Sequence, residues 1–64
     1  MESRLKEVRE ANKLSQEELA EMSGVSRTTI SYLETGKADV AKTDTLSKLA
    51  EALGVSIGQL FFSQ

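Results

Sequence analysis

Side chains of the kinds that can read base edges are concentrated between residues 26 and 35. On a helix of about 3.6 residues per turn, Ser26, Ile30 and Leu33 share one face, which we expect to point into the core. The opposite face carries Arg27, Thr28, Ser31, Tyr32 and Thr35. Arginine can pair with guanine through two hydrogen bonds, threonine can hydrogen-bond or touch a thymine methyl group, and tyrosine can reach a base or a phosphate. The pattern predicts either a face that reads the major groove of DNA or an ordinary solvated helix face.

Two short helical patterns, separated by a glycine, must position this face. The first opens with a capping box, Ser15-x-x-Glu18, in which each residue's side chain accepts from the other's backbone N–H. Gly24 ends that pattern, because a left-handed backbone is easily adopted by glycine. Ser26 can cap the helix that follows. A helix pair with so short a turn is either a structural hairpin or a helix-turn-helix.

Apolar spacing along the rest of the chain predicts five short helices around one core, an all-α fold without strand-like alternation. We expect the first three helices at about 2–12, 16–22 and 27–35, a polar loop at 36–42, and a fourth helix that is capped by Thr43 or Asp44 and stops at Gly54. A short fifth helix follows the capping box Ser56-x-x-Gln59 and includes Ile57, Leu60 and Phe61. The residues expected to line the first two helices are Leu5, Val8, Leu19, Ala20 and Met22.

One short sequence occurs twice. Residues 19–26 read LAEMSGVS and residues 49–56 read LAEALGVS, so six of eight positions match. Two copies are too few for a stacked repeat array, and both are explained by a helix that ends at glycine before a serine cap. The first copy leads into a polar helix and the second into an apolar segment. Only the first could therefore read DNA.

Composition restricts the chemistry available to the chain. Its 64 residues contain no cysteine and no histidine, which excludes disulfides and the usual zinc ligands. The sequence has no glycine-rich phosphate loop and is too short to enclose a substrate pocket, so we expect no enzyme activity, no metal, no cofactor and no small-molecule ligand. It also has no apolar run of membrane-spanning length, and we expect a single cytoplasmic domain over residues 1–64.

The balance of charge argues mildly against general nucleic-acid binding. Eight basic and ten acidic residues give a net charge of −2, with a pI of about 5.0, whereas many nucleic-acid-binding domains are basic. The acidic residues lie mostly in the first two predicted helices, and we expect most of them to sit away from the exposed face of residues 27–35. Any DNA binding should therefore be specific, with weak non-specific affinity.

Between residues 15 and 35 the chain resembles the helix-turn-helix of the Cro and phage-repressor family of transcription regulators. The matching features include Ala20 packed between the two helices, Gly24 in the turn and Ile30 in the second helix, and the likeness extends over about residues 4–61. The other residues that carry it are Arg9, Ser15, Gln16, Leu19, Val25, Ser26, Leu33, Glu34, Gly36, Lys37, Leu49, Ala50 and Leu53. The resemblance implies a compact five-helix, lambda-repressor-like DNA-binding domain whose second and third helices form the helix-turn-helix.

It also implies a role for each matching residue. The base-reading set is Arg27, Thr28, Tyr32 and Ser31, with Arg27 the leading member. The phosphate-contacting set is Gln16, Ser26, Thr29, Thr35, Lys37 and Lys42, with Gln16 at a helix N-terminus. Arg9 and Glu34 correspond to the family's buried ion pair, which joins the first and third helices. The implied function is sequence-specific binding of double-stranded DNA by a transcriptional regulator, expected to be a repressor.

The apolar C-terminal segment leaves two interpretations open. Leu60, Phe61 and Phe62 either complete the core or form a two-fold contact between copies, since exposed aromatic residues are enriched at interfaces. A homodimer would read a pseudo-palindromic operator. The rival to DNA binding is a protein-interaction module, such as an antitoxin or an adaptor with the same fold.

Overall fold

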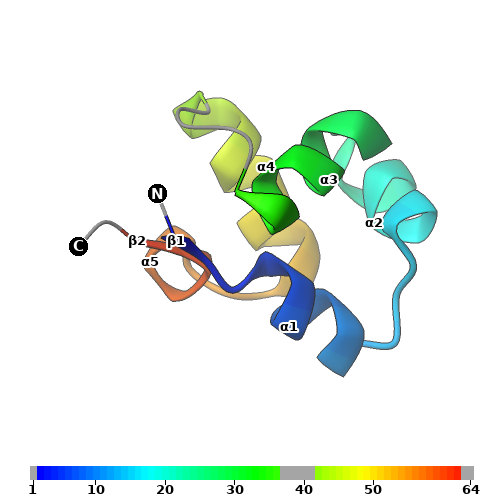
Figure 1. Cartoon of the computed structure of the whole chain (residues 1–64), viewed down its shortest axis with the longest axis horizontal. Coiled ribbons are helices and arrows are strands. Elements are labelled where there is room, and N and C mark those ends of the chain that lie inside the picture. The colour runs from blue at the N-terminus through cyan, green and yellow to red at the C-terminus, as the bar shows by residue number, and fades with distance from the viewer. Residues whose placement is uncertain (1, 37–41, 63–64) are drawn as a thin grey trace.

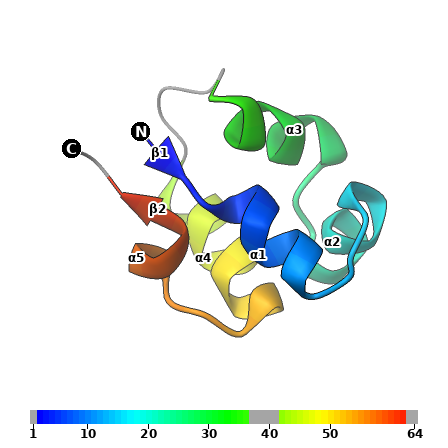
Figure 2. The same cartoon turned by 60° about the horizontal axis from the view of Figure 1, so that its bottom comes forward.

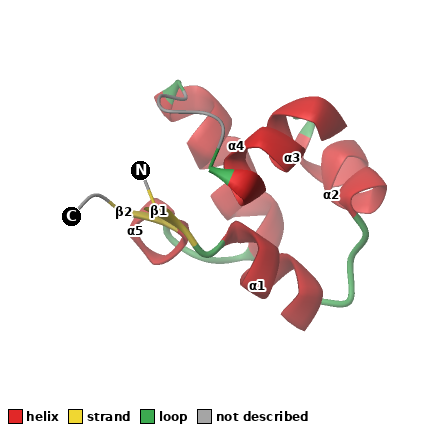
Figure 3. Cartoon of the chain, in the orientation of Figure 1, coloured by secondary structure: helices red, strands yellow, loops and turns green. Residues whose placement is uncertain are grey.

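The first and last described elements pair with each other, and a bundle of helices lies between them in sequence. The computed structural model describes residues 2–36 and 42–62. Within these ranges the elements are β1 (Glu2–Ser3), α1 (Leu5–Ala11), α2 (Gln16–Ser23), α3 (Arg27–Thr35), α4 (Thr43–Leu53), α5 (Ile57–Leu60) and β2 (Phe61–Phe62) (Figure 1, Figure 3). The expected all-α architecture with five helices is therefore confirmed for the described part of the chain.

The core is shared among the helices. Each of the five helices in the described ranges contributes one fully buried side chain, namely Leu5, Leu19, Ile30, Leu49 and Leu60. Helix α2 packs against both α3 and α4, and α1 packs against α3; Figure 2 shows α1 crossing in front of α4. Because no helix can bury its apolar stripe alone, this mutual packing holds the short helices in place.

Local signals determine where α2 begins and where α2 and α4 end. Ser15 Oγ accepts from the N–H of Glu18 (3.0 Å), and the N–H of Ser15 donates to Glu18 Oε1 (2.9 Å), which completes the predicted capping box. Gly24 and Gly54 follow the two helices with φ of 77° and 72°. These are left-handed conformations, in which a side chain is disfavoured.

A small β-ribbon at the ends of the chain was not expected from the sequence. Glu2 pairs with Phe62 and Ser3 with Phe61 in antiparallel register, and the N–H of Arg4 donates to the carbonyl of Leu60 (2.8 Å). Helix α1 consequently begins at Leu5, not near residue 2, and α5 ends at Leu60. Phe61 belongs to a strand, so its assignment to the fifth helix was wrong.

Two further local predictions were wrong. Met22 does not line the core: it is 56% exposed and borders an open hollow between α2 and α4, beside Lys48 and Ala52. The N-terminal cap of α4 is Lys42, with no capping hydrogen bond from its side chain. Thr43 is already the first helical residue, so neither it nor Asp44 occupies the cap position.

Candidate nucleic-acid interface

The turn between α2 and α3 is built by three consecutive residues with different tasks. The N–H of Gly24 donates to the carbonyl of Ala20 (2.9 Å) and ends α2. Val25 turns inward and is buried. Ser26 then caps α3, its Oγ accepting from the N–H of Thr29 (3.2 Å). The predicted inward placement of Ser26 was wrong, because a cap residue lies at the exposed start of its helix.

Helix α3 is divided into an apolar face and a polar face. Ile30 and Leu33 are buried in the core, with exposed fractions of 0% and 2%. On the other side Thr28 is exposed, Tyr32 is 49% exposed and Ser31 is half-buried. The side chain of Arg27 is 61% exposed. The helix is thus anchored by branched apolar residues, while the side chains of Arg27, Thr28 and Tyr32 remain accessible.

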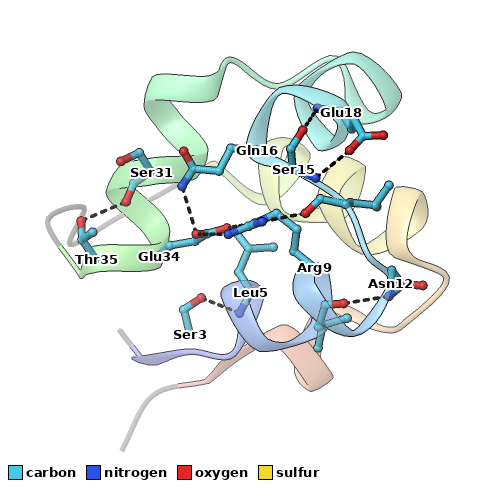
Figure 4. A network of polar contacts seen from close by, with 12 residues as sticks. Ser3, Leu5, Arg9, Asn12, Ser15, Gln16, Glu18, Ser31, Glu34 and Thr35 are labelled. Atoms are coloured by element: carbon cyan, nitrogen blue, oxygen red, sulfur yellow. Dashed lines mark hydrogen bonds and ion pairs between the residues drawn. The ribbon is translucent and has the colours of Figure 1, made fainter.

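The C-terminal half of α3 is held by a polar network that reaches α1 and α2 (Figure 4). Arg9 Nε donates to Glu34 Oε2 (2.7 Å) and Nη2 to Glu34 Oε1 (3.1 Å), while Nη1 donates to the carbonyl of Leu14 (2.7 Å). Gln16 Nε2 adds a bond to Glu34 Oε1 (3.1 Å). The side chains of Arg9 and Glu34 are only 10% and 3% exposed, so the implied pairing of these two residues is present and buried.

Full hydrogen bonding makes this burial tolerable. Within the described ranges, no buried side-chain nitrogen or oxygen lacks a partner, and an unpaired charge in such a place would be strongly destabilising. The hydrogen bond to Glu34 and the neighbouring negative charge raise the pKa of Arg9 further above its ordinary value, against the opposing effect of burial. Arg9 is therefore a permanent cation, and the network fixes α3 relative to α1 and α2.

A second arginine–glutamate pair lies at the other end of α3. Arg27 Nη1 donates to Glu17 Oε1 (2.8 Å), and the two side chains are 61% and 72% exposed. Glu17 is an exception to the expectation that most of the acidic residues lie away from the reading face. Ten residues separate the two along the chain, and only the crossing of α2 and α3 brings them together. No periodicity within a single helix could have signalled this contact.

The predicted phosphate-contacting residues are distributed unevenly. Gln16 is half-buried and one amide hydrogen goes to Glu34, while Thr29 is half-buried and bonded to Ser26 Oγ (2.9 Å). Thr35 Oγ1 donates back to the carbonyl of Ser31 (2.9 Å). Lys42 is exposed at the start of α4. Lys37 lies outside the described residues.

Two of the three predicted dimer residues are inside the core of their own chain. Leu60 is 0% exposed and Phe61 is 5% exposed, so they stabilise the monomer and offer no surface to a second copy. The side chain of Phe62 lies outside the described part of the structure.

Within ranges 2–36 and 42–62 there is no group of three or more acidic, histidine or cysteine side chains placed to hold a metal ion. None of the helices in these ranges is both long and apolar enough to cross a membrane.

Comparisons with known proteins agree with the geometry. A family model described as "Helix-turn-helix" matches residues 5–60. In Bacillus subtilis (strain 168), the HTH-type transcriptional repressor RghR is 45% identical over 58 residues, covering 91% of this chain and 43% of that protein. The uncharacterized HTH-type transcriptional regulator RghRB of the same strain is 47% identical over 51 residues, covering 80% and 37%.

The solved SinR protein/SinI protein complex contains a chain with the same fold. It superposes with a TM-score of 0.83 at 30% identity, covering 88% of this chain and 54% of that one. This chain therefore spans less than half the length of the two curated relatives and about half of the solved one. The matched family model, the relatives and the placement of α2 and α3 lead to one conclusion. The chain belongs to the helix-turn-helix family of the Cro and phage-repressor type.

Proposed function

We propose that this chain binds double-stranded DNA at specific sequences, with α3 in the major groove. We further propose that it acts as a transcriptional repressor in the cytoplasm. The observation that carries the proposal is the division of α3. Ile30 and Leu33 are buried, while Arg27, Thr28 and Tyr32 are exposed on the helix that follows the turn. In this docking mode, the N-terminal residues of the second helix contact base edges. Arg27 is the first residue of α3 and is the leading base-reading residue.

Contacts to the phosphates would hold this helix in register. The N-terminus of α2 presents backbone N–H groups near Gln16, and a helix N-terminus favours an anion. Ser26, Thr29, Thr35, Lys37 and Lys42 remain the other candidates. The described surface of α3 carries one cation, Arg27, so few phosphates are neutralised there. Non-specific affinity is therefore expected to be weak.

Two-fold symmetry of the bound state is a further part of the proposal. Helix-turn-helix proteins bind as dimers with half-sites about 34–36 Å apart, and the operator is expected to be pseudo-palindromic. With Leu60 and Phe61 buried in the monomer, Phe62 remains the candidate from the original dimer set.

Selection of bound DNA from a random pool, followed by measurement of Arg27→Ala on the selected site, tests the proposal. The wild-type chain should enrich one motif at low salt. Arg27→Ala should weaken binding by about 1–3 kcal/mol and relax the preference at one base pair, as expected for loss of an arginine–guanine contact.

Arg4→Ala is a matched control for this experiment. Arg4 lies outside α3, its side chain is also 61% exposed, and it also pairs with a glutamate that is 72% exposed, Glu7. Loss of this arginine should leave the base preference unchanged. Failure of the wild-type chain to enrich any motif would favour the protein-interaction module instead, and equal effects of the two variants would remove Arg27 from the reading set.

A further inference from the structure

On the exposed surface, the leading reading residue Arg27 is paired with an acidic neighbour, Glu17. Glu17 lies in the first turn of α2, and its Oε1 accepts from Arg27 Nη1 at 2.8 Å. Both side chains are more than half exposed. An exposed ion pair of this kind contributes little to folding, so stability does not explain its presence at the proposed interface.

The pair with Glu17 leaves Arg27 enough N–H donors to read a base. An arginine has five N–H donors in a rigid fork, and a guanine uses two of them. Within the described structure, the guanidinium of Arg27 donates one hydrogen bond, from Nη1 to Glu17. The other donors remain available for a guanine edge. Arg9 differs, because all three of its guanidinium nitrogens donate to protein oxygens.

The position of the Glu17 carboxylate also affects contacts with the phosphates of DNA that lacks the target sequence. In the proposed docking mode, the N-terminus of α2 faces a phosphate, and a carboxylate in its first turn repels that phosphate. A flexible arginine without a partner could bind phosphates of any sequence, which adds affinity without discrimination. A carboxylate that holds the arginine weakens such contacts, and specificity often depends on disfavouring the wrong partner in this way.

We propose that Glu17 is a positioning residue that determines specificity: it holds Arg27 toward one base pair and penalises phosphate-only binding. This inference rests on the proposed function. Glu17 makes no contact with a base in this arrangement and acts through the side chain of Arg27. It should therefore change the ratio between affinities for right and wrong sequences more than it changes the fold.

The test measures the binding of each variant to two DNA sites. One site is the motif selected by the wild-type chain. The other differs from it at one base pair, the one at which Arg27→Ala relaxes the preference. The measured quantity is the ratio of the two dissociation constants. Glu17→Ala should reduce this ratio by roughly three- to tenfold, part of the discrimination that a bidentate arginine–guanine contact supplies. Glu17→Gln should keep the ratio within about twofold, because its amide oxygen can accept the same hydrogen bond.

Affinity for random-sequence DNA gives a second readout. Both Glu17 variants remove one negative charge, so each should bind random DNA more tightly, by roughly two- to fivefold at low salt. Glu7→Ala is the matched control. It removes a glutamate of the same 72% exposure that pairs with Arg4 in the same chain, and it should leave the discrimination ratio unchanged.

A double variant separates positioning from other effects. In the Arg27→Ala background, Glu17→Ala should no longer change the ratio, because there is no arginine to orient. An unchanged ratio in the Glu17→Ala single variant would overturn the inference, as would an equal loss in both backgrounds. Circular dichroism checks that each variant is folded. If Arg27→Ala itself relaxes no base preference, the proposed function has failed at its reading residue. If it does so while Glu17→Ala has no effect, the inference about Glu17 alone has failed.

Discussion

Two arginine–glutamate pairs join α3 to the rest of the molecule, one near each end of the helix. Arg9–Glu34 is 10% and 3% exposed, and both guanidinium and carboxylate make further bonds to Leu14 and Gln16. Arg27–Glu17 is 61% and 72% exposed and rests on one hydrogen bond. The chemistry is the same, but the surroundings differ. A buried pair whose partners are all satisfied fixes the helix, whereas an exposed pair orients its arginine through one bond and leaves the other N–H donors accessible.

Removal of the buried carboxylate tests this contrast most severely. Glu34→Ala leaves the Arg9 charge buried without its partner, and the free energy of unfolding should fall by about 3–5 kcal/mol. At 0.05–0.15 kcal/mol per residue, a domain of this size has only about 3–10 kcal/mol in total. The variant should therefore lose about a third or more of its total stability, as measured by urea denaturation followed by circular dichroism. Glu17→Ala serves as the control and should lose less than about 1 kcal/mol; equal losses would contradict the contrast.

A smaller effect is expected when the charge is retained but the fork is lost. Arg9→Lys keeps a cation beside Glu34, yet one ammonium group cannot reproduce both bonds to the carboxylate and the bond to the Leu14 carbonyl. The free energy of unfolding should fall by about 1–3 kcal/mol. The contribution of Arg9 to the free energy of unfolding of the wild-type chain should not vary between pH 5 and 9. The hydrogen bond to Glu34 raises the pKa of Arg9 further above its already strongly basic ordinary value, so its stabilisation is fully present throughout this pH range. A marked pH dependence of the difference between the two proteins would argue against this account.

The smallest effect concerns the exposed pair itself. A double-mutant cycle of Glu17→Ala and Arg27→Ala should give a coupling of about 0.2–1 kcal/mol in urea denaturation at low salt. Salt should remove most of this coupling, because exposed charges are screened over about 3 Å at 1 M. A coupling above 2 kcal/mol, or one that does not respond to salt, would mean that Arg27–Glu17 behaves energetically like the buried pair Arg9–Glu34 and would contradict the contrast.

Some parts of the fold could be predicted because the signals are local. The capping box of Ser15 and Glu18 and the glycine at position 24 act within a few residues, and the apolar faces of α3 and α4 follow helical periodicity. The β-ribbon could not be predicted in this way. Two-residue strands are too short to show alternation, and they form only because the helices bring Ser3 and Phe61 together.

The candidate site was predictable in the same uneven manner. The division of α3 followed from its periodicity, and the pairing of Arg9 with Glu34 came through a family resemblance. Two contacts depend on how α2 crosses α3: the contact of Glu17 with Arg27 and the contact of Gln16 with Glu34. For Met22 the helical pattern was misleading: this apolar residue of α2 was expected in the core, yet it is 56% exposed. Small domains have too little interior to cover every apolar side chain.

The ribbon of β1 and β2 has a consequence for the order of folding. It joins Glu2 to Phe62, so its formation closes almost the entire chain into a loop, with an entropy term of about 3–4 kcal/mol from the length dependence alone. Two residues per strand return few hydrogen bonds against that term. Contacts between neighbouring helices, such as α2 and α3, close much shorter loops and should form earlier. The ribbon should therefore form late in folding. Its amide hydrogens should exchange with solvent before those of the helices.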